Sequence, residues 1–228
     1  MDNILLIETS TALCSVALAQ DGAVTAYRES SAPKAHASLT AVFIQEMLQE
    51  RGLTLADCKA VCVSKGPGSY TGLRVGVSTA KGLCFGSGKP LLAVGTLDTL
   101  VAQAATVIPS EVTHVIPSEV EGSTFRYIIP MIDARRMEVY TAVFENGVQI
   151  TETAPAIIDE TSFAEYLEQG PCLFIGDGAG QCADIIKHPN AHFHQCCPKA
   201  SAMLSPAIEA YKAGKFEDVA YFEPFYLK

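Results

Sequence analysis

The sequence predicts an α/β protein in two halves, built from mixed sheets flanked by helices. At residues 3–28, three short apolar segments follow one another with only brief polar turns between them, as expected of antiparallel strands. At residues 60–105, apolar segments alternate with helix-like segments, an order that implies parallel strands with helices on the sheet faces. The two arrangements in one chain predict a mixed sheet.

Local signals define the elements of the first half. The Asp21-Gly22 pair predicts a two-residue hairpin turn between the second and third strands. The helix that follows has a broad apolar arc, which indicates either contacts on two sides or deep burial. The predicted strands span residues 3–7, 14–19, 23–28, 60–64 and 90–94, and the predicted helices span residues 35–51, 69–85 and 96–105.

The second half is separated from the first by an internal repeat. Residues 107–112 return almost unchanged as residues 115–120, which indicates an exposed insertion or, as the alternative, an added edge hairpin. The expected domains are an N-terminal lobe at 1–106 with the partner-binding helices, the insertion at 107–122 and a C-terminal lobe at 123–228, whose final segment could dock back. In that second lobe we expect strands at 127–133, 138–144 and 172–175, helices at 162–169 and 202–213, and an extended aromatic tail at 223–228 that docks on the protein.

The composition favours a reduced, cytoplasmic protein with a sizeable core. The chain has 228 residues, of which 49% are hydrophobic, yet no apolar run approaches the ~20 residues that cross a bilayer. The start of the sequence has no basic region of the kind found in signal peptides. Several of the eight cysteines, such as Cys14 and Cys62, lie in apolar segments, where a free thiol behaves as a small hydrophobe.

The charge argues against a chain that binds nucleic acid by itself. The formal net charge is -9, and the Lys and Arg residues are scattered rather than gathered into a basic patch. If nucleic acid is involved, another chain should supply most of the contact.

A glycine-rich stretch at residues 65–88 is the most unusual feature of the sequence. Each glycine inside a helix costs about 1 kcal/mol relative to alanine, so their presence needs a reason. Residues four apart share a face, and the small residues here form two ridges almost bare of side chain. One ridge is Gly72, Gly76 and Ala80, and the other is Ser78, Gly82 and Gly86. We expect this helix to be a docking surface, with Arg74 and Lys81 as its polar rim.

Two glycine-rich turns are candidates for nucleotide contact. The turn at 66–72 lacks the Gly-Lys-Ser/Thr ending of a P-loop, and Thr71 replaces the third glycine of the dinucleotide fingerprint. Residues 8–11 resemble the first phosphate loop of actin-like ATPases without its glycine, and residues 176–180 could be a second such loop. For each, an ordinary tight turn is the competing interpretation. The candidate contacts are Gly66, Gly68, Ser69, Thr71, Gly176 and Gly178.

No catalytic set and no metal site is predicted. The His and Cys residues at positions 188–197 match no known zinc spacing, so a polar loop is the favoured interpretation. His36 has no second histidine at helical spacing, and there is no H-E-x-x-H or G-x-S-x-G motif.

Taken together, several segments resemble the TsaB family, also called YeaZ. The resemblance runs from the first strand to the closing residues and is most specific at residues 66–83. The matching segments are I-L-L-I-E-T-S at 4–10, S-V-A-L at 15–18, G-P-G-S-Y-T-G-L-R-V-G at 66–76, A-K-G-L at 80–83, D-A-R-R at 133–136 with Val139-Tyr140, and P-F-Y-L-K at 224–228.

This resemblance implies an actin-like ATPase fold (the ASKHA, RNase H-like class) with two related lobes. It implies a non-catalytic role in making threonylcarbamoyladenosine on tRNA, as the partner of the catalytic subunit TsaD and of the ATPase TsaE, with tRNA reached through the complex. Helices 35–51 and 69–85 would bind TsaD, and nucleotide could lie at that junction, with no cofactor of the chain's own. The implied contacts are His36, Leu39, Val42, Phe43, Glu46, Leu73, Arg74, Gly76, Val77, Ala80 and Lys81.

Two other functions remain open at this point. The chain could be an actin-like ATPase or small-molecule kinase that uses residues 8–11 and 176–180. A glycoprotease-like metallopeptidase is a third interpretation, and it would require a metal. The isolated chain could also form a homodimer through the same two helices.

Overall fold

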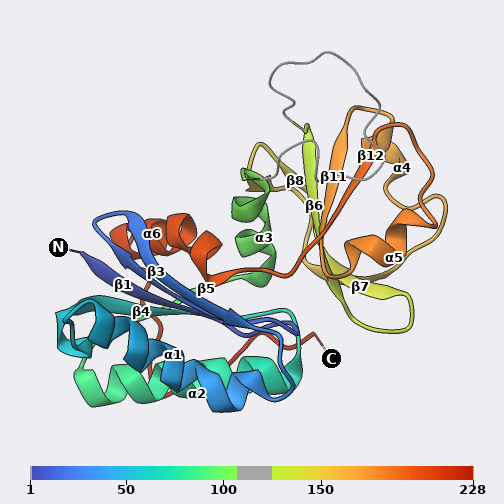
Figure 1. The fold of residues 1–228 in the computed structure, drawn as a ribbon. Helices are drawn as coiled ribbons and strands as arrows, with labels where there is room; N and C mark the ends of the chain where they lie inside the picture. The colour runs from blue at the N-terminus through green and yellow to red at the C-terminus, as the bar shows by residue number, and fades with distance from the viewer. Residues whose placement is uncertain (1, 107–124, 228) are drawn as a thin grey trace. The chain divides into compact units, whose positions relative to one another are not determined.

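The computed structural model describes residues 2–106 and 125–227, and within them the chain forms two compact units. The first unit comprises residues 1–99 with 198–226, and the second comprises residues 100–197 (Figure 1). The predicted insertion at 107–122 lies outside the described residues. The predicted C-terminal lobe was too long, because residues 198–226 return to the first unit.

The first unit has a mixed sheet with the strand order β3-β2-β1-β4-β5. The first three strands pair antiparallel, and β4 and β5 add in parallel, as the sequence predicts. Its elements are β1 (Asn3–Glu8), β2 (Cys14–Gln20), β3 (Ala23–Ser30), α1 (Ala35–Glu50), β4 (Cys58–Ser64), α2 (Tyr70–Ser87), β5 (Leu91–Val94) and α6 (Leu204–Lys212), and α3 (Thr96–Ala104) leads from this unit into the second.

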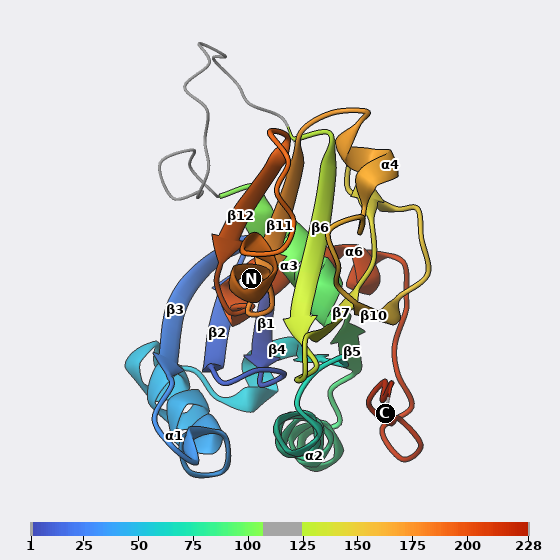
Figure 2. The same ribbon diagram turned by 90° about the vertical axis from the view of Figure 1, so that its right-hand side faces the viewer.

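Both faces of this sheet are apolar, and each is covered by different helices. Leu5 and Ile7 of β1 pack in the cluster that α1 and α2 complete, whereas Ile4 and Leu6 pack against the segment that contains α6. Figures 1 and 2 show α1 and α2 on one side of the sheet and α6 on the other. Because alternate strand residues point to opposite faces, the second face needs a cover, which residues 200–211 of the returning segment supply. The later residues Val219 and Phe222 pack on the first face instead.

The second unit is also built on a mixed sheet, with the order β10-β7-β6-β11-β12 and β8 and β9 joined to β6. Strands β6, β11 and β12 are parallel, and the others pair antiparallel. The elements are β6 (Tyr127–Asp133), β7 (Glu138–Thr141), β8 (Phe144–Glu145), β9 (Val148–Gln149), β10 (Ala154–Ile157), α4 (Ala164–Leu167), β11 (Cys172–Gly176), α5 (Ala179–Ala183) and β12 (Ala191–Gln195).

Three predictions for this unit were wrong in detail. The helix expected at 162–169 is the single turn α4, and the strand expected at 138–144 is divided between β7 and β8. The region interpreted as a polar loop contains β12. Its Phe193 stacks on Phe174 in the core, with ring centroids 4.9 Å apart, while the histidines on either side are half-buried. This alternation is a strand pattern that the two histidines obscured.

Candidate functional site

The inner ridge of α2, formed by Gly72, Gly76 and Ala80, packs inside the first unit. A Cβ atom on Gly72 would collide with the Thr9 carbonyl oxygen, and one on Gly76 would collide with the Thr9 hydroxyl. The Thr9 hydroxyl donates to the Gly72 carbonyl at 2.9 Å. The glycines therefore allow the backbone of α2 to lie directly against the turn that follows β1.

The start of α2 is fixed by the same turn. The Ser69 amide donates to the Ser10 carbonyl oxygen at 2.6 Å, and the Ser69 hydroxyl caps the helix by accepting from the Gly72 amide. At Gly68 a Cβ atom would lie 2.9 Å from the Ser10 Cβ. This close packing is the reason that the glycine-rich turn precedes the helix.

Four predicted partner contacts are wrong because they belong to the interior of the first unit. Leu73, Gly76, Val77 and Ala80 are buried, and Val77 and Ala80 join the core cluster beneath the sheet. These four residues are not available to another chain while this unit stays folded.

The outer ridge of α2 is open. No atom would lie within 4 Å of a Cβ added at Gly82 or Gly86. Between them Phe85 is 87% exposed, and near the start of the helix Tyr70 is 55% exposed. Both aromatic residues were missed from the sequence. The signal for Phe85 was its seven-residue spacing from Ser78, which places it on the same helix face.

The neighbouring helix α1 adds to this surface. Val42 is 42% exposed, Glu46 is exposed, and Leu39 and Phe43 are half-buried. His36 is held at the start of the helix, where its Nε2 lies 2.9 Å from the Thr11 carbonyl oxygen. The accessible side of α1 therefore carries three apolar side chains together with His36 and Glu46.

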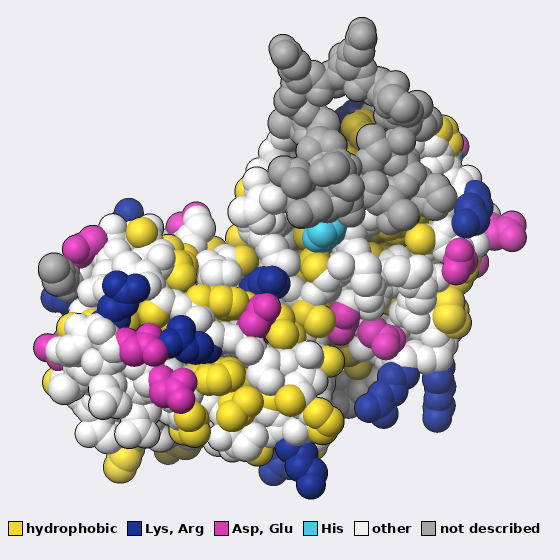
Figure 3. Space-filling model, in the orientation of Figure 1, with side chains coloured by type: hydrophobic (Ala, Val, Ile, Leu, Met, Phe, Trp, Pro, Cys, Tyr) yellow, Lys and Arg dark blue, Asp and Glu magenta, His cyan; other side chains and the backbone are white. Residues whose placement is uncertain are grey.

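We call the accessible sides of these helices the α1–α2 face. Figure 3 shows hydrophobic side chains gathered over the part of the first unit where the two helices lie. The face is formed by His36, Leu39, Val42, Phe43, Glu46, Tyr70, Arg74, Ser78, Lys81, Gly82, Phe85 and Gly86.

The C-terminal tail borders this face. Lys81 donates from Nζ to the carbonyl oxygens of Ala220 and Phe222 at 3.1 and 3.0 Å. The ring of Tyr226 lies 4.8 Å from that of Tyr70, centroid to centroid. The Lys81 side chain is thus hydrogen-bonded to the tail. Arg74 is the exposed cation of the predicted polar rim.

The turn at residues 8–11 is closed rather than open to a ligand. All four residues are buried, and the Ser10 amide donates to Glu8 Oε1 at 2.7 Å. Burial raises the pKa of Glu8 to about 7, so this carboxyl group favours its neutral form. The predicted contacts Gly66 and Gly68 are packed against the chain itself, whereas Ser69 and Thr71 are exposed beside them.

The second glycine-rich turn is also occupied by protein groups. Gln195 accepts from the Gly180 amide through Oε1 at 2.5 Å and donates to the Asp177 carbonyl oxygen at 2.8 Å. Gly176 has φ +137° and leaves no room for a Cβ beside the Met131 carbonyl oxygen. Burial raises the pKa of the Asp177 carboxyl to about 6. Gly176 and Gly178 therefore serve the local packing.

The histidine and cysteine segment does not gather into a metal site. Among the residues that the structure describes, no group of three or more His, Cys, Asp or Glu side chains could hold a metal ion. His192 lies on β12, where burial lowers its pKa.

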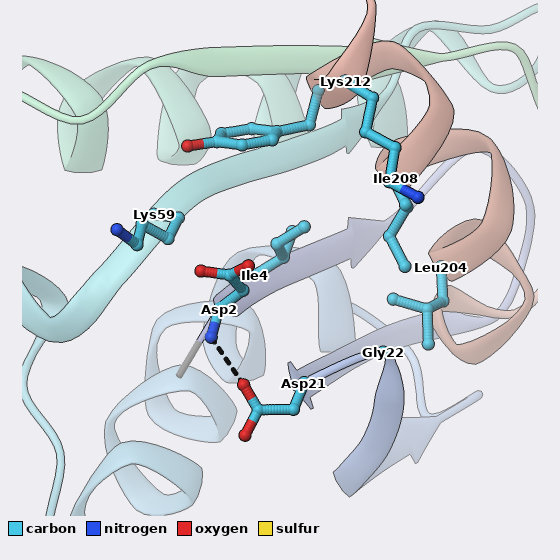
Figure 4. Close-up of a pocket in the computed structure, with 9 residues that line it drawn as sticks. Asp2, Ile4, Asp21, Gly22, Lys59, Leu204, Ile208 and Lys212 are labelled. Carbon is cyan, nitrogen blue, oxygen red and sulfur yellow. Dashed lines mark hydrogen bonds between the residues drawn. The ribbon is translucent and has the colours of Figure 1, made fainter.

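One pocket of about 450 Å³ opens in the first unit, away from all the predicted site residues. Figure 4 shows it between the start of β1, the β2–β3 turn, the start of β4 and α6. Ile4, Leu204 and Ile208 give it an apolar wall, and Lys59 and Lys212 lie at its edges.

Within residues 2–106 and 125–227, no helix has the length and apolar character needed to cross a membrane.

Comparisons with known proteins agree on one pathway. The family model described as TsaD, tRNA N6-adenosine threonylcarbamoyltransferase, matches residues 29–169. The tRNA threonylcarbamoyladenosine biosynthesis protein TsaB of Escherichia coli (strain K12) is 33% identical, over 99% of this chain and 94% of that protein. The TsaB protein of Bacillus subtilis (strain 168) is 31% identical, over 76% of this chain and 70% of its own length.

Solved structures show the same relationship. YeaZ from Pseudomonas aeruginosa superposes with a TM-score of 0.80 at 26% identity, and the match covers 100% of both chains. The activator of the 2-hydroxyisocaproyl-CoA dehydratase from Clostridium difficile superposes with a TM-score of 0.50 at 10% identity, over 93% of this chain and 96% of that one. The second likeness shows the fold alone. The predicted actin-like fold class is confirmed.

Proposed function

Because the chain belongs to the TsaB (YeaZ) family, we propose that it is the non-catalytic subunit that binds a TsaD-like transferase in tRNA threonylcarbamoyladenosine biosynthesis. The observation that carries this proposal is Phe85, an almost fully exposed aromatic side chain between two glycines with open space above them. Tyr70 and Val42 are exposed on the same α1–α2 face, and apolar patches of this kind, unlike single exposed side chains, mark interaction sites.

The shape of the α1–α2 face suits helix packing. Gly82 and Gly86 let another backbone approach closely, and Phe85 supplies apolar area that a partner can bury. The match of residues 29–169 to the TsaD family model indicates that the partner has related helices in the same order. Two such helix pairs can form a four-helix bundle with apolar residues at its centre.

The partner is proposed to supply the chemistry. In this chain the turn at 8–11 is buried under α2, and the turn at 176–180 is filled by Gln195. A TsaE-like ATPase is expected to join the pair, and tRNA is expected to reach the chain within that complex. The eight cysteines are all free thiols, which suits the reducing cytoplasm where we propose that the complex acts.

Charge substitutions on the α1–α2 face test the proposal. Phe85→Glu and Val42→Glu are expected to weaken binding to the TsaD-like protein of the same organism at least thirtyfold, since buried aromatic anchors contribute about 2 kcal/mol or more. The affinity is measured by calorimetry with both purified proteins.

Sedimentation of the chain alone would show whether the same substitution also splits a homodimer.

The control is Ile157→Glu, which places the same charge on an apolar side chain that is 76% exposed in the second unit. It is expected to bind the TsaD-like protein as the wild type does. Wild-type affinity of Phe85→Glu, with an unchanged circular dichroism spectrum, would place the interface elsewhere.

A nucleotide titration separates this function from the alternative of an actin-like ATPase or kinase. The isolated chain is expected to give no binding heat with magnesium and ATP, because both candidate phosphate turns are filled by the protein's own groups. Stoichiometric, magnesium-dependent binding by the chain alone would favour the enzyme instead. Binding by the pair, and by neither chain alone, would place the nucleotide at the junction of the two chains.

A further inference from the structure

The turn between β6 and β7 has a strained backbone that presents two arginines. Arg135, Arg136 and Met137 have φ values of 69°, 56° and 63°, the left-handed region that residues other than glycine seldom adopt. Each such residue is energetically unfavourable, and such conformations persist where the surrounding structure holds them. Three in succession, in a turn that contains no glycine, suggest that the sequence retains these side chains for their chemistry.

Hydrogen bonds hold this turn firmly. The Ala134 amide donates to the Glu138 carbonyl oxygen at 2.9 Å, and the Glu138 amide donates to the Arg135 carbonyl oxygen at 3.2 Å. The Arg135 amide donates to Asp133 Oδ1 at 2.8 Å. The paired strands on either side fix the ends of the turn. The positions from which the two arginine side chains leave the backbone are therefore well defined.

Both guanidinium groups are available for an external anion. Arg135 and Arg136 are exposed, and within the described part of the chain neither has an ion-pair partner. The nearest carboxylates in sequence are those of Asp133 and Glu138. Asp133 accepts from the Arg135 amide and lies 3.4 Å from the Gln181 side-chain amide, and Glu138 is half-buried. Figure 3 shows Lys and Arg side chains projecting beyond the end of the second unit where β7 lies in Figure 1.

The geometry favours two anionic groups rather than one. Successive residues of a helical conformation, of either hand, point roughly 100° apart around its axis. The two side chains therefore diverge from adjacent Cα atoms and would reach neighbouring anions along a chain. The planar guanidinium group binds phosphate with two parallel hydrogen bonds. Successive phosphates of a nucleic acid backbone meet both requirements.

We propose that Arg135 and Arg136 bind neighbouring phosphates of the tRNA while the chain is in its complex. This inference rests on the proposed function, which brings tRNA to the complex. A chain with a net charge of -9 repels RNA over most of its surface, so a local cationic contact is needed wherever the two approach. An acidic segment of a partner protein is the competing ligand, and the experiment below distinguishes the two.

The experiment measures binding of an unmodified, transcribed tRNA to the complex of this chain with its TsaD-like partner, by filter binding over a salt series. Arg135→Ala/Arg136→Ala is expected to weaken binding about tenfold at 0.15 M salt. The slope of log affinity against log salt should fall by about 1.5, because each phosphate contact contributes about 0.7–0.9. The tRNA affinity of Arg135→Lys/Arg136→Lys should lie between those of the wild type and the double alanine variant.

Lys212→Ala/Lys215→Ala removes the same charge from exposed positions of the first unit and is expected to leave tRNA binding unchanged. Unchanged tRNA affinity in the double arginine variant would overturn the inference and leave the proposed function intact. Loss of affinity for the TsaD-like protein would also overturn it, since the turn would then bind protein. If the wild-type chain does not bind that protein, the proposed function fails, and the same variants are compared for tRNA binding by the chain alone.

Discussion

Gly76→Ala and Gly72→Ala are expected to destabilise the first unit by about 3 kcal/mol each, whereas the same change at Gly82 or Gly86 should stabilise it by about 0.5–1 kcal/mol. At the inner pair the new methyl group would collide with Thr9. At the outer pair nothing lies within 4 Å, so only the gain in helix propensity remains. Replacement of glycine by alanine in α2 should thus lower the free energy of unfolding at the inner ridge and raise it at the outer ridge.

Urea unfolding followed by circular dichroism measures these differences, with each variant compared with the wild type at one pH. The two units can unfold separately, so the transition of the first unit must be resolved before a free energy is assigned. If Gly76→Ala proved as stable as the wild type, α2 would not lie against the turn at residues 9–10. The outer variants also test partner binding. Gly82→Ala should lower the affinity for the TsaD-like protein, although it stabilises the free chain.

Glu8→Gln is expected to remove a large pH-dependent contribution to stability. Burial raises the pKa of Glu8 from 4.5 to about 7, so the folded protein holds this proton more tightly than the unfolded chain. Its contribution is fully present below about pH 4.5 and is lost as the pH rises through about 7. The difference between the two pKa values corresponds to about 3 kcal/mol.

The measurement is the free energy of unfolding of wild type and Glu8→Gln at pH 5 and pH 8. Glutamine keeps an oxygen that can accept from the Ser10 amide, and it has no charge to bury. Relative to the wild type, the variant should therefore gain stability between the two pH values. Glu160→Gln, at an exposed site, serves as the control and should show no such gain. A difference between Glu8→Gln and wild type that is the same at both pH values would mean that Glu8 is ionised throughout.

Much of the fold could be predicted because it depends on local signals. The first sheet follows from its apolar segments, and the hairpin follows from Asp21-Gly22, whose φ values of 51° and 86° suit a type I′ turn. Strand β12 was missed because two histidines occupy its polar positions. The C-terminal return was expected only for the final segment, and its full extent over residues 198–226 was not predicted, because no local pattern states which face of a distant sheet a helix will cover.

The candidate site stays a prediction, and the sequence did not separate its buried residues from its exposed ones. Spacing placed Arg74 and Lys81 on one helix face, and the structure leaves Arg74 exposed while Lys81 binds the C-terminal tail. Phe85 is the most exposed large apolar side chain of the face. It was not predicted as a contact, because helical spacing shows which residues share a face and does not show which face is exposed.

By itself the sequence determined the family, the order of the elements in the first sheet and the presence of two bare ridges on α2. Only the tertiary structure decided that Gly72 and Gly76 face the chain's own Thr9, and that Gly82 and Gly86 face outward. Helical spacing states which residues share a side of a helix, but the rotation of that helix about its axis is set by what packs against it. Here the contact that sets it comes from a turn more than 60 residues earlier in the chain.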